Sequence, residues 1–200
     1  VLQQNLLELI RRTSSQLPTD VARVIDKGWR KEKKDSAGKY ALEVIRDNIG
    51  MAKTKSQPIC QDTGAIICYV DLPTWMDENS FKKAFDKAVV KATKVGYLRQ
   101  NSVDSITGHN SGTNLGPGNP NYHFHPARGK SLRVRMMLKG GGCENMSAQY
   151  SLPDNRIGAG RDLEGVRKCL LDAVLNAQGK GCGPGILGVC IGGDRASGHL

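Results

Sequence analysis

Residues 65–71, Ala-Ile-Ile-Cys-Tyr-Val-Asp, are a short apolar run that follows a loop at 56–64. Such a run predicts a buried β-strand. A helix is predicted next, over 80–97, because apolar and basic residues recur there with helical spacing. Its apolar stripe consists of Phe81, Phe85, Ala88, Ala92 and Val95, and its basic stripe of Lys83, Lys87, Lys91 and Lys94. We expect the strand and the apolar stripe to share one core.

Helices are predicted before this strand, and a loop, further strands and another helix are predicted after the 80–97 helix. Apolar periodicity predicts helices through the first fifty residues, and a Gly-, Asn- and Pro-rich segment at 107–121 predicts a long loop. The other predicted elements are strands at 121–126 and 131–138, a helix at 161–178 with Leu163, Val166, Leu170, Ala173, Val174 and Ala177 inward, and a buried strand at 186–193, ILGVCIGG.

These elements predict a mixed α/β fold. A helical N-terminal region precedes a mixed β-sheet with flanking helices and long Gly-rich loops. We expect residues 1–200 to be one N-terminal domain, with a helical subregion at 1–55. The chain does not begin with Met, so we expect it to be part of a longer protein.

The composition argues against membrane and nucleic-acid proteins. No run of about 18 apolar residues is present, as a spanning helix would need. The net charge is +10, but three Phe, five Tyr and two Trp do not interleave with basic residues as a stacking platform requires. We interpret the basic charge as a solvated lysine surface. The start does not resemble a secretory signal, which predicts a cytoplasmic protein with reduced thiols.

The six cysteines divide by their surroundings. Cys68, Cys169 and Cys190 lie in apolar stretches and are predicted to be buried structural residues. Cys60 follows Pro-Ile and precedes Gln-Asp-Thr-Gly, and Cys182 lies in Gly-Lys-Gly-Cys-Gly-Pro-Gly. Thiols on such loops suit a bulky inorganic cluster, although the spacing alone leaves a cluster site and a chance arrangement equally open.

Cys143 follows three glycines and is predicted to lie near the site without being a ligand. No CxxC pair occurs anywhere, which argues against a zinc ribbon.

Four segments resemble a known family. They are PICQDTG (58–64), ATKVGYLRQNSVD (92–104), KGGGCENMS (139–147) and GCGPGILGVCIGG (181–193). In this order they are similar to the class I, oxygen-sensitive fumarases and the related L-tartrate dehydratase alpha subunits. The resemblance begins near residue 5 and extends to the end of the chain.

The resemblance implies roles for particular residues. Cys60 and Cys182 resemble two of three cysteines that hold a [4Fe–4S] cluster, whose fourth iron binds substrate oxygen. The remaining implied residues are substrate-facing: Gln61 and Asp62 beside the first ligand, Arg99 on a substrate carboxylate, and Gly141 and Gly142 in a backbone-lined part of the pocket. The implied reaction is the reversible hydration of fumarate to malate, a step of the tricarboxylic acid cycle.

The residue types suit this chemistry. An open iron can act as a Lewis acid toward a departing hydroxide. Arg99 can hold a carboxylate through a planar pair of hydrogen bonds, and Asp62 can exchange a proton with the hydroxyl. Two simpler interpretations stay open: Asp62 can be a turn or cap carboxylate, and Arg99 can form a surface ion pair.

The resemblance also implies parts that residues 1–200 lack. These are the third cluster cysteine and a C-terminal, beta-type domain or subunit, and we expect the fragment to be inactive alone and the complete protein to be a homodimer acting on a small dicarboxylate. A tartrate dehydratase alpha subunit is the alternative within the family. A zinc-binding structural module using His123 and His125 is an alternative of another class.

Overall fold

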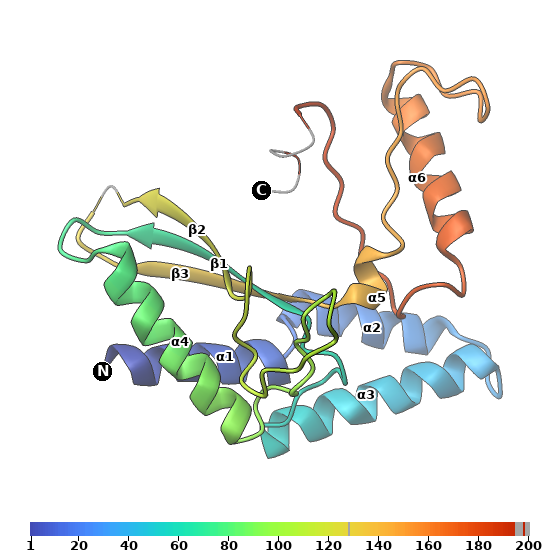
Figure 1. Cartoon of the computed structure of the whole chain (residues 1–200). Helices are drawn as coiled ribbons and strands as arrows, with labels where there is room; N and C mark the ends of the chain where they lie inside the picture. The colour runs from blue at the N-terminus through green and yellow to red at the C-terminus, as the bar shows by residue number, and fades with distance from the viewer. Residues whose placement is uncertain (128, 195–197, 199–200) are drawn as a thin grey trace. The chain divides into compact units, whose positions relative to one another are not determined.

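The computed structural model describes residues 1–127, 129–194 and 198. It confirms a mixed α/β fold, shown in Figure 1. In chain order the elements are α1 (Leu2–Ser15), α2 (Thr19–Lys31), α3 (Ala37–Lys55), β1 (Ala65–Leu72), α4 (Glu78–Lys94), β2 (Asn121–Pro126), β3 (Arg133–Lys139), α5 (Gly141–Glu144) and α6 (Leu163–Ala177).

The chain divides into two compact units, an N-terminal unit (Val1–Gly141) and a C-terminal unit (Gly142–Leu200). The N-terminal unit holds the whole sheet and the first four helices. The assignment of residues 1–200 to one domain stays a prediction.

The sheet is built around β1, with strand order β2-β1-β3. β1 pairs with β2 in parallel and with β3 in antiparallel, which makes the sheet mixed as predicted. Along β1, Ile66, Cys68 and Val70 are fully buried, and the residues between them are partly exposed. This alternation places one face of β1 in the core, because successive side chains of a strand point to opposite faces.

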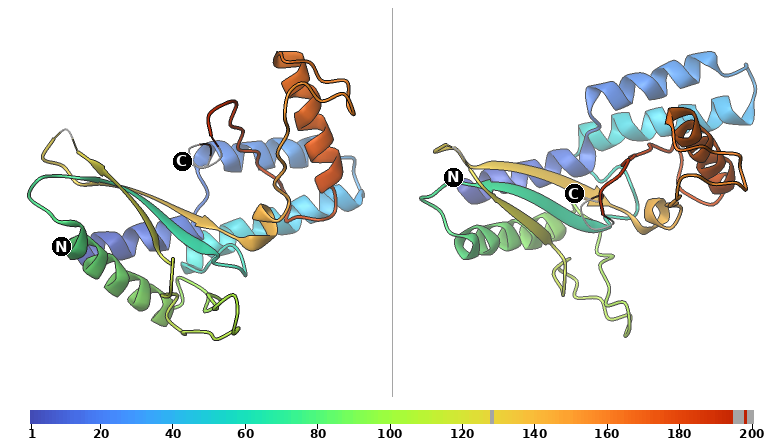
Figure 2. Two further views of the ribbon diagram at one scale, coloured as in Figure 1. Left: turned by 45° about the horizontal axis from the view of Figure 1, so that its top comes forward. Right: turned by 90° about the horizontal axis from the view of Figure 1, so that it is seen from above.

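Helices α1 and α4 cover that buried face, as the two views of Figure 2 show. Phe81 and Phe85 of α4 are 0% exposed, and Ile10 of α1 lies in the same cluster. The two Phe rings are 5.9 Å apart, and Tyr122 of β2 meets Phe85 edge-on at 5.8 Å. The apolar stripe is therefore confirmed for Phe81, Phe85, Ala88 and Ala92, and the lysines opposite are exposed.

Helix starts follow local capping signals. The side chain of Asp77 accepts a hydrogen bond from the Ser80 backbone N–H at 2.9 Å and so caps α4. Ser36 caps α3 in the same way through the Lys39 N–H, at 3.0 Å. These bonds satisfy backbone donors that a helix start leaves without partners. The helices predicted in the first fifty residues are confirmed as α1, α2 and α3.

The prediction of a strand at 186–193 is wrong. This segment has no strand assignment, and its large apolar side chains, Ile186, Leu187, Val189 and Ile191, are 50–74% exposed. A strand needs a partner for its backbone hydrogen bonds, and no described strand pairs with this segment. Cys190, predicted to be buried, is exposed for the same reason.

Three other apolar residues are more exposed than predicted. Val95 is 43% exposed because it is the C-cap residue, one position beyond the end of α4. Leu163 and Val174 of α6 are 80% and 41% exposed, whereas Val166, Leu170, Ala173 and Ala177 are partly buried. The C-terminal unit has one long helix and little other regular structure, so it cannot cover a wide helix face.

Among the described residues, none of the helices combines the length and the apolar character that crossing a membrane would require.

We expect Phe85→Ala to lower the free energy of unfolding by about 3–5 kcal/mol, because it leaves a cavity between α4 and the sheet. Urea unfolding followed by circular dichroism measures this. The matched control is Val90→Ala on the same helix, where the side chain is 37% exposed and a change within about 0.5 kcal/mol is expected. Equal effects of the two substitutions would contradict the assignment of Phe85 to the core.

Candidate active site

The chain that leads to Cys60 is fixed from two helices. The Ile59 backbone N–H donates to the carbonyl oxygen of Ser14 at the end of α1, at 2.9 Å. The Ile59 carbonyl accepts from the side-chain amide of Asn48 on α3, also at 2.9 Å. Both the backbone N–H and the backbone carbonyl of Ile59 are therefore hydrogen-bonded, which fixes the position of the backbone just before Cys60.

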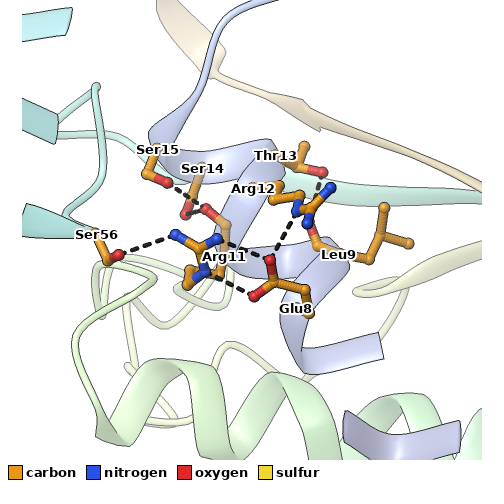
Figure 3. A network of polar contacts seen from close by, with 8 residues as sticks. All are labelled: Glu8, Leu9, Arg11, Arg12, Thr13, Ser14, Ser15 and Ser56. Carbon is orange, nitrogen blue, oxygen red and sulfur yellow. Dashed lines mark hydrogen bonds and ion pairs between the residues drawn. The ribbon is translucent and has the colours of Figure 1, made fainter. Parts of the chain in front are cut away.

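A charged network at the end of α1 supports this anchor (Figure 3). Arg11 forms two hydrogen bonds of 2.7 Å to the carboxylate of Glu8 and one of 2.9 Å to the Ser56 hydroxyl. Arg12 donates to the same carboxylate at 2.7 Å. Ser56 is the C-cap of α3 and has a left-handed backbone, with φ of 53°. Arg11 therefore joins the ends of α1 and α3, and the loop to Cys60 starts there.

The carboxylate of Asp62 binds groups from three segments. One oxygen, Oδ1, accepts from the Gly64 backbone N–H at 2.8 Å and from the Asn101 amide at 3.1 Å. The other, Oδ2, accepts from the Gly141 N–H at 3.2 Å. The bond to Gly64 is the turn interaction that the simpler interpretation of Asp62 predicted. The bonds to Asn101 and Gly141 also bring two distant motifs to the Cys60 loop.

Gly64 is required by its surroundings as well as by its backbone. Its φ is +69°, and a β-carbon added there would lie 2.1 Å from the carbonyl oxygen of Lys139. Such a distance is far below van der Waals contact, so a side chain cannot fit without moving backbone. The glycine lets the loop approach the end of β3, where the 140–142 motif begins.

Arg99 is fixed through its backbone, and its guanidinium is exposed. The Arg99 N–H donates to the Thr63 hydroxyl at 2.8 Å, and the Arg99 carbonyl accepts from Asn114 at 2.7 Å. Thr63 is 4% exposed and Asn114 1% exposed. Within the part of the chain that the structure describes, no ion pair or hydrogen bond engages the guanidinium, so the predicted surface ion pair is not formed there.

The asparagines of the 101–121 segment were not predicted as site residues. Asn114 has a left-handed backbone with φ of 60°, and its side chain binds Thr93, Arg99 and Ser102. Asn119 donates to the carbonyl oxygen of Asn114 and accepts from the Ile66 N–H at the start of β1. The signal for these roles was the repeated asparagine in a long Gly-rich loop, because asparagine tolerates positive φ and replaces missing backbone partners.

The two predicted cluster ligands have properties that fit an iron–sulfur group. Cys60 is exposed, and its Sγ accepts from the Asp62 N–H at 3.4 Å, the kind of amide contact that stabilises a thiolate. Cys182 is also exposed, and a β-carbon at Gly142 would lie 2.8 Å from its Sγ. Gly142 and Cys182 are therefore neighbours within the C-terminal unit. Cys60 belongs to the N-terminal unit, so its convergence with Cys182 stays a prediction.

Other candidates separate clearly from this loop cluster. Burial raises the pKa of Cys68 to about 12, and Cys169 is 6% exposed, so both are structural thiols as predicted. The side chain of Cys143 lies outside the described residues.

His123 stacks on Tyr69 with ring centroids 5.0 Å apart. Across the described chain, no group of three His, Cys, Asp or Glu side chains could hold a metal ion, so nothing there supports the zinc alternative.

Comparisons with known proteins agree on one family. A family model described as fumarate hydratase (fumerase) matches residues 3–200. A Geobacillus stearothermophilus protein provisionally named fumarate hydratase class I is 47% identical, over 99% of this chain and 39% of its own length.

Two further relatives carry the name of another activity. A Methanocaldococcus jannaschii protein provisionally named L(+)-tartrate dehydratase subunit alpha is 31% identical, over 94% of this chain and 66% of its own length. The L(+)-tartrate dehydratase subunit alpha of Escherichia coli K12 is 27% identical, over 89% of this chain and 57% of its own length. The chain spans less than two thirds of the length of each of these relatives.

We expect Gly64→Ala to lower the free energy of unfolding by about 2–4 kcal/mol, because left-handed strain and overpacking against Lys139 add together. Gly108→Ala is the matched control: its φ is +70°, but nothing lies within 4 Å of the added carbon. The control should cost about 1 kcal/mol. Chemical denaturation of both variants tests this, and equal losses would show that the approach to Lys139 is not the constraint.

Hydrogen bonds from Arg11 and Arg12 lower the pKa of Glu8 from 4.5 to about 2. A carboxylate with a lowered pKa in the folded state stabilises the protein fully above its unfolded pKa and loses this effect as pH falls. We therefore expect the stability advantage of the unmodified protein over Glu8→Gln to shrink between pH 4.5 and about 2.

Urea unfolding at pH 7, 4 and 2.5 measures this advantage. The control is Gln3→Ala at an exposed position of α1, which changes no titrating group and should keep a constant difference from the unmodified protein. A Glu8→Gln difference that does not change over this pH range would contradict the role of the Arg11 and Arg12 contacts.

Proposed function

Because the chain belongs to the fumarate hydratase (fumerase) family, we propose that it is the N-terminal, cluster-binding part of a hydro-lyase that interconverts fumarate and malate. One observation carries the proposal. The carboxylate of Asp62 joins the Cys60 loop to the segment after Arg99 and to the 140–142 glycines, so three predicted site motifs form one loop cluster.

Cys60 and Cys182 would hold two irons of a [4Fe–4S] cluster, with a third cysteine from a part of the protein outside residues 1–200. When bound, such a cluster supplies a Lewis-acidic iron for the hydroxyl and one carboxylate of the substrate. The exposed thiols and the glycine beside Cys182 support this ligand assignment.

Arg99 would bind the second substrate carboxylate. Its guanidinium carries no internal partner among the described residues, and its backbone is fixed at both the N–H and the carbonyl. A planar guanidinium can form two parallel hydrogen bonds to a carboxylate, which fixes orientation as well as position. Because the Arg99 backbone is already ordered before substrate binds, binding requires little further loss of conformational entropy at this residue. More of the interaction energy can then orient the substrate.

Asp62 would exchange a proton with the substrate hydroxyl through Oδ2. Oδ1 already accepts two hydrogen bonds, whereas Oδ2 accepts one, from Gly141. A carboxylate oxygen has room for two acceptor bonds, so Oδ2 can still meet a hydroxyl. Gln61 is exposed next to it and would bind the substrate through its side-chain amide.

The glycines would act mainly by having no side chain. The Gly141 N–H is already used by Asp62, and a β-carbon at Gly141 would meet nothing within 4 Å. Gly141 therefore leaves open space beside Asp62, which would give room to a small substrate. Gly142 would leave room for Cys182.

An L-tartrate dehydratase alpha subunit is the second candidate. Two relatives that carry this name match most of the chain, at 31% and 27% identity. This function uses the same dehydration chemistry and requires a beta-type partner as a separate subunit. For the fumarase we propose instead a C-terminal, beta-type part, a homodimer and a cytoplasmic location.

The complete protein, reconstituted with iron and sulfide without oxygen, should hydrate fumarate, as followed by the loss of fumarate absorbance. Exposure to air should remove the activity, because an iron without a protein ligand is readily lost on oxidation. Turnover of L-tartrate but not of fumarate would favour the second candidate. Full activity after prolonged exposure to air would contradict the cluster assignment.

We expect Arg99→Lys in the complete protein to lower kcat/KM for fumarate by roughly 10- to 150-fold. Lysine keeps the positive charge but cannot form the planar pair of bonds, and one hydrogen bond to a charged group is worth about 1.5–3 kcal/mol. The matched control is Arg133→Lys on β3, where the side chain is 77% exposed near Asp71. A change within about twofold is expected for the control. Similar losses for both substitutions would show that Arg99 has no special contact with substrate.

A further inference from the structure

We propose that Asn101 is a positioning residue that holds Gln61 and Asp62 in their working orientation, an inference that rests on the proposed function. Its side chain contacts three consecutive residues of the Cys60 loop. The amide Nδ2 donates to the Gln61 carbonyl and to Asp62 Oδ1, each at 3.1 Å. The Oδ1 of Asn101 accepts from the Thr63 N–H at 3.3 Å.

This arrangement needs both hydrogen-bond characters of asparagine. A side-chain amide offers two donors and an acceptor on one short, planar group. Aspartate keeps the size and the acceptor but has no donor when ionised, and it would place a second carboxylate beside Asp62. Alanine removes every contact but adds no repulsion.

Asn101 is itself held in place by its neighbours. Arg99 is bound by Thr63 and Asn114, and the Ser102 N–H donates to the side chain of Asn114 at 3.3 Å. The residue therefore lies between two anchored positions. A group whose own position is fixed can fix the groups that it binds.

The consequence is a single geometric link between the two proposed substrate contacts. Arg99 and Asn101 belong to one anchored segment, and Asn101 binds the loop that carries Asp62. Their separation is then set by the fold rather than by the substrate. A carboxylate clamp and a proton-exchanging group with a fixed separation select a substrate of matching length.

Asn101→Asp and Asn101→Ala in the complete protein test this inference. If the donors position Asp62, Asn101→Asp should lower kcat for fumarate by roughly 10- to 100-fold, and more than Asn101→Ala does, with a smaller change in KM. A space-filling role would give the opposite order, because alanine is the smaller residue. Asn110→Asp is the control: Asn110 binds the Gln100 carbonyl in the same segment but makes no contact with Asp62.

A second measurement does not depend on activity. Hydrogen exchange, followed by mass spectrometry on peptides that cover residues 62–66, should be several-fold faster in both Asn101 variants, because the Gly64 N–H binds the Asp62 carboxylate. If the complete protein does not hydrate fumarate, the proposed function fails and this exchange decides the positioning role. The inference would be overturned if the exchange rates of both variants equalled those of the unmodified protein. It would also be overturned if Asn101→Ala lowered kcat more than Asn101→Asp.

Discussion

The antiparallel register between β1 and β3 places Ala65 opposite Lys139. Gly64 then meets the Lys139 carbonyl, and Asp62 reaches the Gly141 N–H. The hydrophobic face of β1 fixes this register, because a shift by one residue would move Ile66, Cys68 and Val70 from the core to the open face. The core and the candidate site therefore depend on the same pairing: burial on one face of the sheet sets the position of the loops at its end.

Local patterns in the sequence predicted the elements that pack in the N-terminal unit. The apolar run around Cys68 and the stripe of Phe81 and Phe85 were sufficient for β1 and α4, because both patterns report burial against a large partner. The same reasoning failed for Ile186 and Val189. Their apolar character resembles that of a core strand, but strand formation requires a pairing partner, which a local pattern cannot supply.

For the site, residue types were predicted but their connections were not. Cys60, Asp62 and Arg99 could be selected because their chemistry and the family resemblance agree. The contacts that arrange them pass through Asn101, Asn114 and Thr63, and join residues 12 to 40 positions apart. Such contacts depend on how loops fold over one another, and no periodicity in the sequence encodes them. The repeated asparagines could be recognised in the sequence, but the residues that they bind could not.

The strand order β2-β1-β3 has a consequence for the newly made chain. β1 is made before both of the strands that pair with it, which lie at 121–126 and 133–139. At the usual rate of synthesis this delay is on the order of seconds, during which both edges of an apolar strand lack partners. Helices α1 to α3 precede β1, and α4 is made before β2. Early docking of α1 and α4 on β1 would shield its apolar face from aggregation while the ribosome completes the sheet.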